Sequence, residues 1–171
     1  MIVCIFGLSC VGKSSAASLM ANELGLPLRS CGSAVLAAAS SLGLDIKDLP
    51  DSGHRMVDAE TVAWALKLGS CIVEGRFLDH VLFGLPEPTF SIQLTANADV
   101  RLRRACGRAG HAITMEDLES IDRADREFRR RLYDERKVIA PSLSVDTSES
   151  TVEECVNQLK MATSGLIRPR T

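Results

Sequence analysis

The chain has 171 residues, of which 46% are hydrophobic and 25% are charged, and its formal net charge is -2. This composition is typical of a folded globular protein, and it excludes a disordered tail, a collagen-like repeat and a strongly basic nucleic-acid-binding protein. At roughly 100–200 residues per domain, we expect one domain over residues 1–171. The longest mostly apolar stretch, residues 34–44, is far shorter than the roughly 20 apolar residues of a membrane-spanning helix.

The six cysteines are scattered along the chain without a C-x-x-C pair. The first apolar residues lead directly into a glycine-containing loop, without the basic region and cleavage site of a signal peptide. We therefore expect a cytoplasmic protein with reduced thiols and no membrane partner. Most of the cysteines suit a core, whereas Cys10 lies inside the glycine loop and is the thiol to test for reactivity.

Apolar runs alternate with helical patterns along the chain, which predicts an α/β domain with a parallel sheet. The predicted strands cover residues 2–6, 28–31, 70–74, 89–95 and 142–145. The predicted helices cover residues 13–24, 33–42, 53–68 and 152–161. Two more helices are expected within residues 101–136, separated by Gly107, Gly110 and the stretch at 113–114.

Residues 7–14 read G-L-S-C-V-G-K-S and match the phosphate-loop pattern G-x-x-x-x-G-K-[ST], between a predicted buried strand and a predicted helix. Glycines let the backbone N–H groups surround a phosphate chain, and the helix N-terminus adds its positive dipole end. Lys13 is expected to reach the β- and γ-phosphates, and Ser14 to offer its hydroxyl to Mg²⁺. The ATP-binding residues expected here are Gly7, Leu8, Ser9, Cys10, Val11, Gly12, Lys13, Ser14 and Ser15.

The other motifs favour a small phosphoryl-transfer kinase over other nucleotide-binding proteins. The base-reading motif Asn-Lys-x-Asp of GTPases lacks its lysine at residues 97–99, and motor ATPases usually need a longer chain. Glu74, Gly75 and Arg76 follow the third predicted strand, at the sheet edge where ligands bind in α/β proteins. There Glu74 can accept a proton or orient the acceptor and help organise Mg²⁺, while Arg76 can bind an anionic or carbonyl group.

A second set of charged residues lies on predicted helices. Arg55 and Asp58 are one turn apart on the helix that precedes the third strand, so Arg55 can reach an acceptor phosphate. Residues 101–136 hold 10 of the 15 arginines with eight acidic residues. Within this segment Arg101, Arg104 and Arg108 share one helix face.

Arg123 and Arg130 are two turns apart, with Glu127 between them. Two arginines so placed can fold over a triphosphate while the carboxylate holds one of them, which predicts a lid at about residues 107–135. The interleaved acids and the lack of stacking aromatics argue against a nucleic-acid partner.

The order of these motifs resembles the cytidylate kinase group of nucleoside monophosphate kinases, especially its short archaeal-type members. The resemblance covers about residues 2–160. It rests on the phosphate loop, R-x-x-D at 55–58, E-G-R at 74–76, V-R-x-x-R-x-x-x-R at 100–108, R-x-x-x-E-x-x-R at 123–130 and V-D-T-S at 145–148.

This resemblance implies a P-loop kinase fold: a five-stranded parallel sheet of order 2-3-1-4-5, helices on both faces and a short arginine-rich lid. It also implies transfer of the ATP γ-phosphate, with Mg²⁺, to a nucleoside monophosphate such as CMP or dCMP.

The resemblance further assigns roles to individual residues. Arg123 and Arg130 would bridge the donor and acceptor phosphates, and with Lys13 and Glu74 they form the expected catalytic set. The residues expected near the adenine and phosphates of ATP, beyond the phosphate loop, are Arg104, Arg108, Asp146, Thr147 and Ser148. The expected acceptor-binding residues are Cys31, Gly32, Arg55, Asp58, Glu74, Gly75 and Arg76.

One position departs from the family pattern. Family members carry an arginine four residues after the glycine that here is Gly32, and this chain has Leu36 there. Losing a charge-assisted phosphate contact costs roughly 1.5–3 kcal/mol of acceptor binding. Two alternatives therefore stay open: a kinase of the same fold that phosphorylates a hydroxyl of another metabolite, with Glu74 as the base, and a non-catalytic ATP-binding regulatory module.

Overall fold

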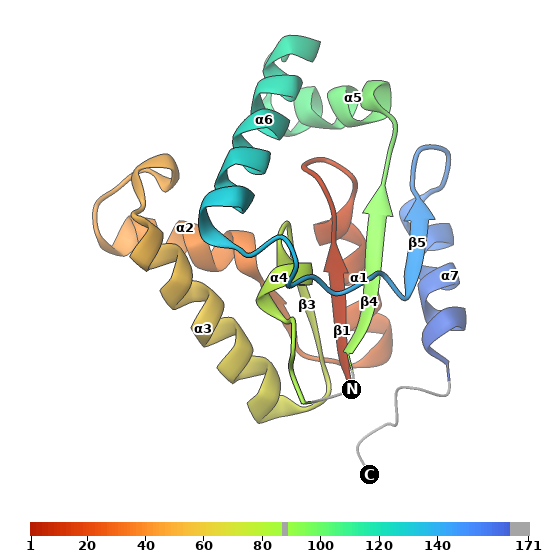
Figure 1. The fold of residues 1–171 in the computed structure, drawn as a ribbon. Coiled ribbons are helices and arrows are strands. Elements are labelled where there is room, and N and C mark those ends of the chain that lie inside the picture. Colours follow the sequence, from red (N-terminus) through yellow and green to blue (C-terminus); the bar gives the residue numbers. More distant parts are fainter. Residues whose placement is uncertain (87–88, 165–171) are drawn as a thin grey trace.

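A computed structural model describes residues 1–86 and 89–164 (Figure 1). Within these ranges five parallel strands form one sheet in the order β2-β3-β1-β4-β5. The strands are β1 Ile2–Phe6, β2 Leu28–Ser30, β3 Cys71–Gly75, β4 Thr89–Thr95 and β5 Leu143–Asp146. The predicted α/β class and the strand order that the resemblance implied are confirmed.

Helices flank this sheet on both faces (Figure 1). They are α1 Lys13–Leu24, α2 Cys31–Ser41, α3 Asp51–Leu68, α4 Leu78–Val81, α5 Ala98–Ala109, α6 Met115–Leu132, α7 Val152–Thr163 and the 3-10 helix η1 Ile46–Asp48. Side chains fix several of the helix starts: Ser30 accepts a hydrogen bond from the Ser33 amide, and Asn97 accepts one from the Val100 amide. Such caps satisfy backbone donors that the first turn leaves free.

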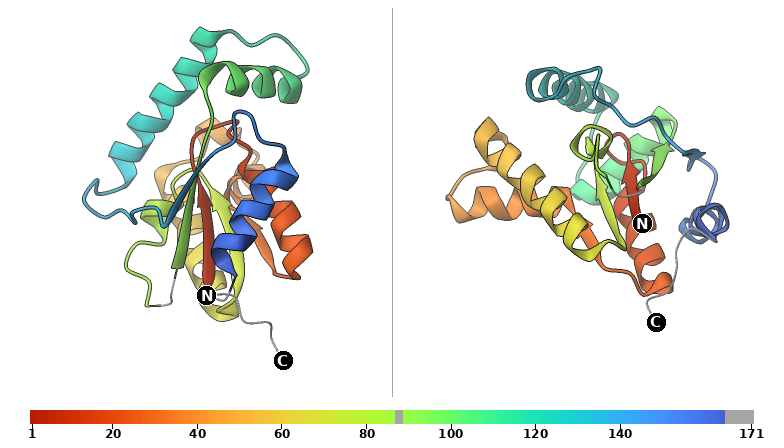
Figure 2. Two further views of the ribbon diagram at one scale, coloured as in Figure 1. Left: turned by 90° about the vertical axis from the view of Figure 1, so that its right-hand side faces the viewer. Right: turned by 60° about the horizontal axis from the view of Figure 1, so that its bottom comes forward.

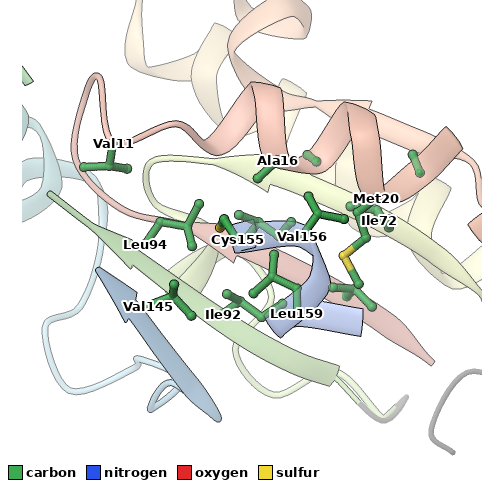
Figure 3. Close-up of a cluster of buried hydrophobic side chains, with 14 residues drawn as sticks. Val11, Ala16, Met20, Ile72, Ile92, Leu94, Val145, Cys155, Val156 and Leu159 are labelled. Carbon is green, nitrogen blue, oxygen red and sulfur yellow. The ribbon is translucent and has the colours of Figure 1, made fainter. Parts of the chain in front are cut away.

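The side chains of β1 alternate between the two faces of the sheet. Val3 and Ile5 pack in the cluster that α1 and α7 cover, shown in Figure 3 with Met20 and Leu159. Ile2, Cys4 and Phe6 belong to the opposite cluster, beneath α3 and α4. Full burial of one such aliphatic side chain stabilises the fold by about 1.5–3 kcal/mol. The central strand is buried throughout because both of its faces are covered.

The structure corrects some predicted boundaries. Gly107 does not separate two helices, since it lies inside α5, which continues to Ala109 and ends where Gly110 adopts a φ of 71°. A single glycine weakens a helix without breaking it. The elements η1 and α4 were not predicted, because three or four residues are too few to show a helical period.

The topology brings the predicted functional segments to one edge of the sheet. All five strands run in the same direction, so their carboxyl ends share that edge, where the loop after β1 and the turn after β3 lie (Figure 1). Helices α5 and α6 lie across the same end of the molecule, away from the N-terminus (Figures 1 and 2). No helix in the two described ranges is long and apolar enough to cross a membrane.

Candidate active site

The phosphate loop, residues 7–14, leads from β1 into α1. Its backbone enters the left-handed region at Gly7, Cys10 and Gly12, with φ angles of 145°, 65° and 96°. At Gly7 a Cβ atom would lie 2.2 Å from the carbonyl oxygen of Leu94, so only glycine fits there. A loop with these turns followed by a helix N-terminus is suited to binding phosphate groups.

Lys13 is enclosed by this loop and is only 9% exposed. Its ammonium group donates a hydrogen bond to the carbonyl oxygen of Leu8, with an Nζ–O distance of 2.6 Å. Burial lowers the pKa of Lys13 to about 8, and the Glu74 carboxylate partly offsets that effect. The loop therefore holds a desolvated cation, whose attraction to phosphate is stronger than that of a solvated lysine.

Glu74 connects the phosphate loop to the start of α2. Its Oε1 accepts a hydrogen bond from the Ser14 hydroxyl at 3.3 Å and another from the Ser30 hydroxyl. The carboxylate is buried at the end of β3. Ser30 also caps α2, so one carboxylate oxygen joins both sides of the predicted site.

The Ser14 hydroxyl and the Glu74 carboxylate are oxygen ligands of the kind that Mg²⁺ prefers. Within residues 1–86 and 89–164 no cluster of three or more His, Cys, Asp or Glu side chains could hold a metal ion. This donor set fits an ion that takes its other ligands from nucleotide phosphates and water, as Mg²⁺ commonly does.

A cavity of about 350 Å³ opens beside the phosphate loop. Arg104 crosses it, donating to the Thr147 hydroxyl at 2.9 Å and to the Thr147 carbonyl at 2.7 Å. The predicted ATP-binding residues that line it are Cys10, Gly12, Lys13, Ser14, Ser15, Arg104, Arg108 and Thr147. Sequence reasoning missed five further lining residues, Ala16, Ser150, Thr151, Val152 and Cys155. The start of α7 coincides with that of the helix predicted at 152–161, but no sequence signal linked this helix to the nucleotide cavity.

The structure places other residues predicted to bind ATP away from this cavity. Val11 belongs to the hydrophobic core, and the Ser9 carbonyl accepts a hydrogen bond from Arg101. Asp146 accepts hydrogen bonds from the backbone amide and the hydroxyl of Ser148, which closes a local turn. Gly7 and Leu8 line a different cavity, described below.

A second cavity, of about 450 Å³, lies between α2, α3 and α6. Of the predicted acceptor-binding residues it is lined by Cys31, Gly32, Asp58 and Arg76. Asp58 accepts a hydrogen bond from the Tyr133 hydroxyl at 2.7 Å, and burial raises the pKa values of both groups. We name this space the acceptor cavity.

Aromatic side chains form part of the wall of the acceptor cavity. The rings of Phe77 and Phe128 stack with centroids 5.3 Å apart, and the His54 ring meets Phe128 edge-on at 4.6 Å. Sequence reasoning missed these rings, because they come from three separate segments, at positions 54, 77 and 128, and follow no common motif.

Three predicted acceptor-binding residues do not line the acceptor cavity, and neither does Leu36, the position that departs from the family pattern. Glu74 is buried behind it, and Gly75 packs so tightly that a Cβ would lie 2.9 Å from the Cβ of Cys31. Arg55 is exposed on α3. Leu36, which replaces the family's arginine, is 55% exposed on α2.

Helix α6 docks through an inward face that repeats every three to four residues. This face consists of Leu118, Asp122, Asp125, Arg129 and Leu132. Its three charged members form ion pairs with other elements: Asp122 with Arg101, Asp125 with Arg76, and Arg129 with Asp79. Helix α6, which belongs to the predicted lid, is therefore attached mainly by three ion pairs that lie between Leu118 and Leu132.

Arg123 and Arg130 lie off this inward face and are exposed. Arg130 pairs with Glu135, with 3.4 Å between Nε and Oε1. In the part of the chain that the structure describes, Glu127 makes no ion pair with either arginine, which corrects the expectation that this carboxylate holds one of them. Glu127 instead lines the acceptor cavity, and the catalytic role of the two arginines stays a prediction.

Two other arginines of α6 face the phosphate loop. Arg126 and Arg129 line a third cavity, of about 310 Å³, together with Gly7 and Leu8. Arg129 is held there by the Asp79 carboxylate. Arg126 is exposed and has no ion-pair partner among the described residues, so it is free to meet an anion beside the loop.

This arrangement combines a phosphate loop, a hydroxyl–carboxylate pair suited to Mg²⁺ and a separate neighbouring cavity, and sequence comparison points in the same direction. No protein-family model matches the chain. Cytidylate kinase from Pyrobaculum islandicum is 26% identical over 161 residues, which cover 91% of this chain and 82% of that protein. Cytidylate kinase from Pyrobaculum arsenaticum is 28% identical over 166 residues, covering 91% and 89%. The chain is cytidylate kinase-like.

Solved structures extend the likeness to the fold. A gluconokinase from Sinorhizobium meliloti has a TM-score of 0.62 at 19% identity. The match covers 96% of this cytidylate kinase-like chain and 91% of the gluconokinase. Shikimate kinase from Aquifex aeolicus has a TM-score of 0.61 at 17% identity, with coverages of 97% and 98%. At these identities the likeness shows the P-loop kinase fold alone, which confirms the expected fold class.

Proposed function

We propose that the protein transfers the γ-phosphoryl group of ATP to a nucleoside monophosphate, CMP or dCMP, in a Mg²⁺-dependent reaction in the cytoplasm. The observation that carries this proposal is the position of Glu74. Its carboxylate accepts a hydrogen bond from Ser14, which lines the cavity beside the phosphate loop, and another from Ser30, which directly precedes the acceptor-cavity residues Cys31 and Gly32. The similarity to cytidylate kinases supports the choice of acceptor.

The donor side uses electrostatic stabilisation by groups already in place. Lys13 carries its desolvated charge toward the β- and γ-phosphates, while Arg104 and Thr147 border the nucleotide. Ser14 and Glu74 would hold Mg²⁺, which, when bound, neutralises charge on the phosphates. Because phosphoryl transfer needs little covalent participation by protein, positioning and charge neutralisation supply most of the rate.

On the acceptor side Arg76 is the group available for the phosphate, since Leu36 replaces the second arginine. Arg76 lines the acceptor cavity and its side chain is 44% exposed. Glu74 would orient the attacking phosphate oxygen from its position at the end of β3. Asp58 and Tyr133 offer a carboxylate and a hydroxyl for the polar edge of a base or sugar.

A second candidate is a kinase that phosphorylates a hydroxyl of a neutral metabolite, and the charges around the acceptor cavity favour it. Arg76 is paired with Asp125, Arg131 with Asp51, and Lys47 lies 4.0 Å from Asp45. Each of these three cations that line the cavity already has an acidic neighbour, and Leu36 adds no further positive charge. No unpaired cation among the three therefore remains to attract a phosphate dianion.

The test is ADP release from Mg-ATP with CMP, dCMP, UMP, AMP, GMP or dTMP as acceptor, and in parallel with neutral polyols. We expect CMP or dCMP to raise ADP release at least about tenfold above the rate without acceptor, and Lys13→Ala to abolish that increase. Stimulation by a polyol alone would favour the second candidate. ATP binding without stimulation by any acceptor would indicate a non-catalytic module.

The departing position gives a sharper test of the nucleotide acceptor. Leu36→Arg restores a guanidinium at the site where the resembling family has one, so we expect the KM for CMP to fall by about tenfold or more. Leu42→Arg is the matched control, because Leu42 is similarly exposed just beyond the end of α2 but is not the position at which the resembling family has its arginine. An unchanged or higher KM in Leu36→Arg would show that the cavity is built for a different acceptor.

A further inference from the structure

Asp125 is a buried carboxylate that the proposed reaction does not use. It lies on the inward face of α6 and is 8% exposed. One of its oxygens, Oδ1, accepts a hydrogen bond from the Arg76 guanidinium, whereas Oδ2 is buried and has no hydrogen-bond partner among the described residues. Burial raises the pKa of Asp125, and the charge of Arg76 opposes that shift. A half-satisfied buried carboxylate costs free energy, because its second oxygen loses water without gaining a donor.

The partner of this carboxylate is the arginine expected to bind the acceptor phosphate. Arg76 and Asp125 both line the acceptor cavity, and both also line the third cavity beside the phosphate loop. The Arg76 side chain is 44% exposed and that of Asp125 only 11%, so an incoming anion meets the guanidinium before it meets the carboxylate. Asp125 therefore accepts from the Arg76 guanidinium in the way that a phosphate oxygen would.

We infer that Asp125 is a specificity-determining residue that competes with the acceptor's phosphate for Arg76. This inference rests on the proposed function, in which Arg76 binds the acceptor phosphate. A phosphate dianion carries more charge and offers three oxygens to a guanidinium, so it can displace a single carboxylate. Acceptors without such a dianion leave the Arg76–Asp125 pair in place.

Displacement of Asp125 also acts on the lid. The Arg76–Asp125 pair is the middle one of the three ion pairs that attach α6, between Arg101–Asp122 and Arg129–Asp79. Once Arg76 turns to a phosphate, Asp125 is left with no cation in hydrogen-bond contact, which favours movement of the helix that carries it. Binding of an anionic acceptor is thereby linked to the position of the lid.

The experiment compares Asp125→Asn with the unaltered protein in calorimetric titrations with CMP and with cytidine, which lacks the phosphate. We expect Asp125→Asn to bind CMP about tenfold more tightly, because Arg76 no longer pairs with a carboxylate, and to bind cytidine as before. Asp125→Glu keeps the charge and is expected to retain the weaker CMP affinity. Glu119→Gln removes a charge from an exposed position of α6 and controls for long-range effects.

Inorganic phosphate, titrated with the phosphate loop filled by a non-hydrolysable ATP analogue, separates this inference from the proposed function. If the unaltered protein neither binds nor phosphorylates CMP, the proposed acceptor is wrong. Competition for Arg76 would still be supported if Asp125→Asn binds inorganic phosphate more tightly and if adding Arg76→Ala abolishes that gain in affinity. Equal phosphate and CMP affinities in Asp125→Asn and the unaltered protein would overturn it. Thermal unfolding of each variant identifies loss of folding, and Asp125→Ser then replaces Asp125→Asn.

Discussion

Lys13 shows how a single residue prepares the site before a nucleotide binds. Its ammonium group is buried and rests on the Leu8 carbonyl, inside a loop that would otherwise have to order around it. Burial disfavours the charged form of Lys13 and lowers its pKa to about 8. A bound triphosphate stabilises the charged form, because it places negative charge beside the buried ammonium group.

This lowered pKa predicts that ATP binding weakens at alkaline pH. In the ligand-free protein Lys13 loses its proton as the pH rises through about 8, whereas the bound triphosphate favours the charged form. Binding above that pH must therefore take up a proton, and the affinity falls by up to about tenfold for each pH unit. Calorimetric Kd values for ATP between pH 7 and pH 9.5 measure the effect.

Lys13→Arg is the matched control for this pH dependence. A guanidinium stays protonated across the range, so we expect weaker ATP binding with an affinity that does not change with pH. The same flat profile in the unaltered protein would contradict the assignment to Lys13.

At the scale of elements, the regular parts of the fold could be predicted because their signals are local. The expected elements at residues 2–6, 13–24 and 89–95 coincide with β1, α1 and β4. β1 is a continuous apolar run, β4 alternates apolar and polar residues, and α1 has a clear end at Gly25. The phosphate loop was equally visible, because its chemistry requires particular residues at fixed spacing within eight positions.

The docking of α6 could not be predicted in the same way. Its pattern shows two arginine sets, and only the tertiary partners decide which one faces inward. Those partners lie 21 to 50 positions away: Asp122 meets Arg101, Asp125 meets Arg76 and Arg129 meets Asp79. Spacing alone selected Arg123 and Arg130, which the structure places on the solvent side of the helix.

This orientation predicts a difference between two arginines of the same helix. Arg126 lines the cavity beside the phosphate loop and has no ion-pair partner among the described residues, so it can neutralise the phosphate during transfer. We expect Arg126→Ala to lower kcat by about a hundredfold and to change the Kd for ATP by less than about threefold. Steady-state kinetics with the best acceptor provides the measurement.

Arg123→Ala is the comparison for that variant, since it removes the same side chain from an exposed position of α6. Its exposed position favours a smaller role than the one that the resemblance implies for Arg123, so we expect Arg123→Ala to lower kcat by less than about tenfold. A larger loss in Arg123→Ala than in Arg126→Ala would show that the lid turns its other face to the phosphates when it closes.

At the scale of the whole molecule, the phosphate loop, the turn after β3 and helix α6 lie at one edge of the sheet (Figure 1), and residues of these segments line the two cavities. Arg101 joins these parts directly. It is 5% exposed, donates from Nε to the Ser9 carbonyl of the phosphate loop at 2.8 Å, and donates two hydrogen bonds to Asp122 of α6 at 2.8 and 2.6 Å. Arg101 thus connects the phosphate loop directly to the helix whose next inward residue, Asp125, pairs with Arg76.

This connection predicts that donor and acceptor bind cooperatively. We expect a non-hydrolysable ATP analogue to tighten CMP binding by at least about fivefold, and CMP to tighten binding of the analogue by the same factor, as linkage requires. In Arg101→Lys a single nitrogen replaces the three guanidinium nitrogens that contact the Ser9 carbonyl and both oxygens of Asp122, so the factor should fall below about twofold. Arg103→Lys, at an exposed position of the same helix, should keep the full factor. Unchanged cooperativity in Arg101→Lys would mean that the two sites communicate by another route, because the link between the phosphate loop and the lid would then carry none of the coupling free energy.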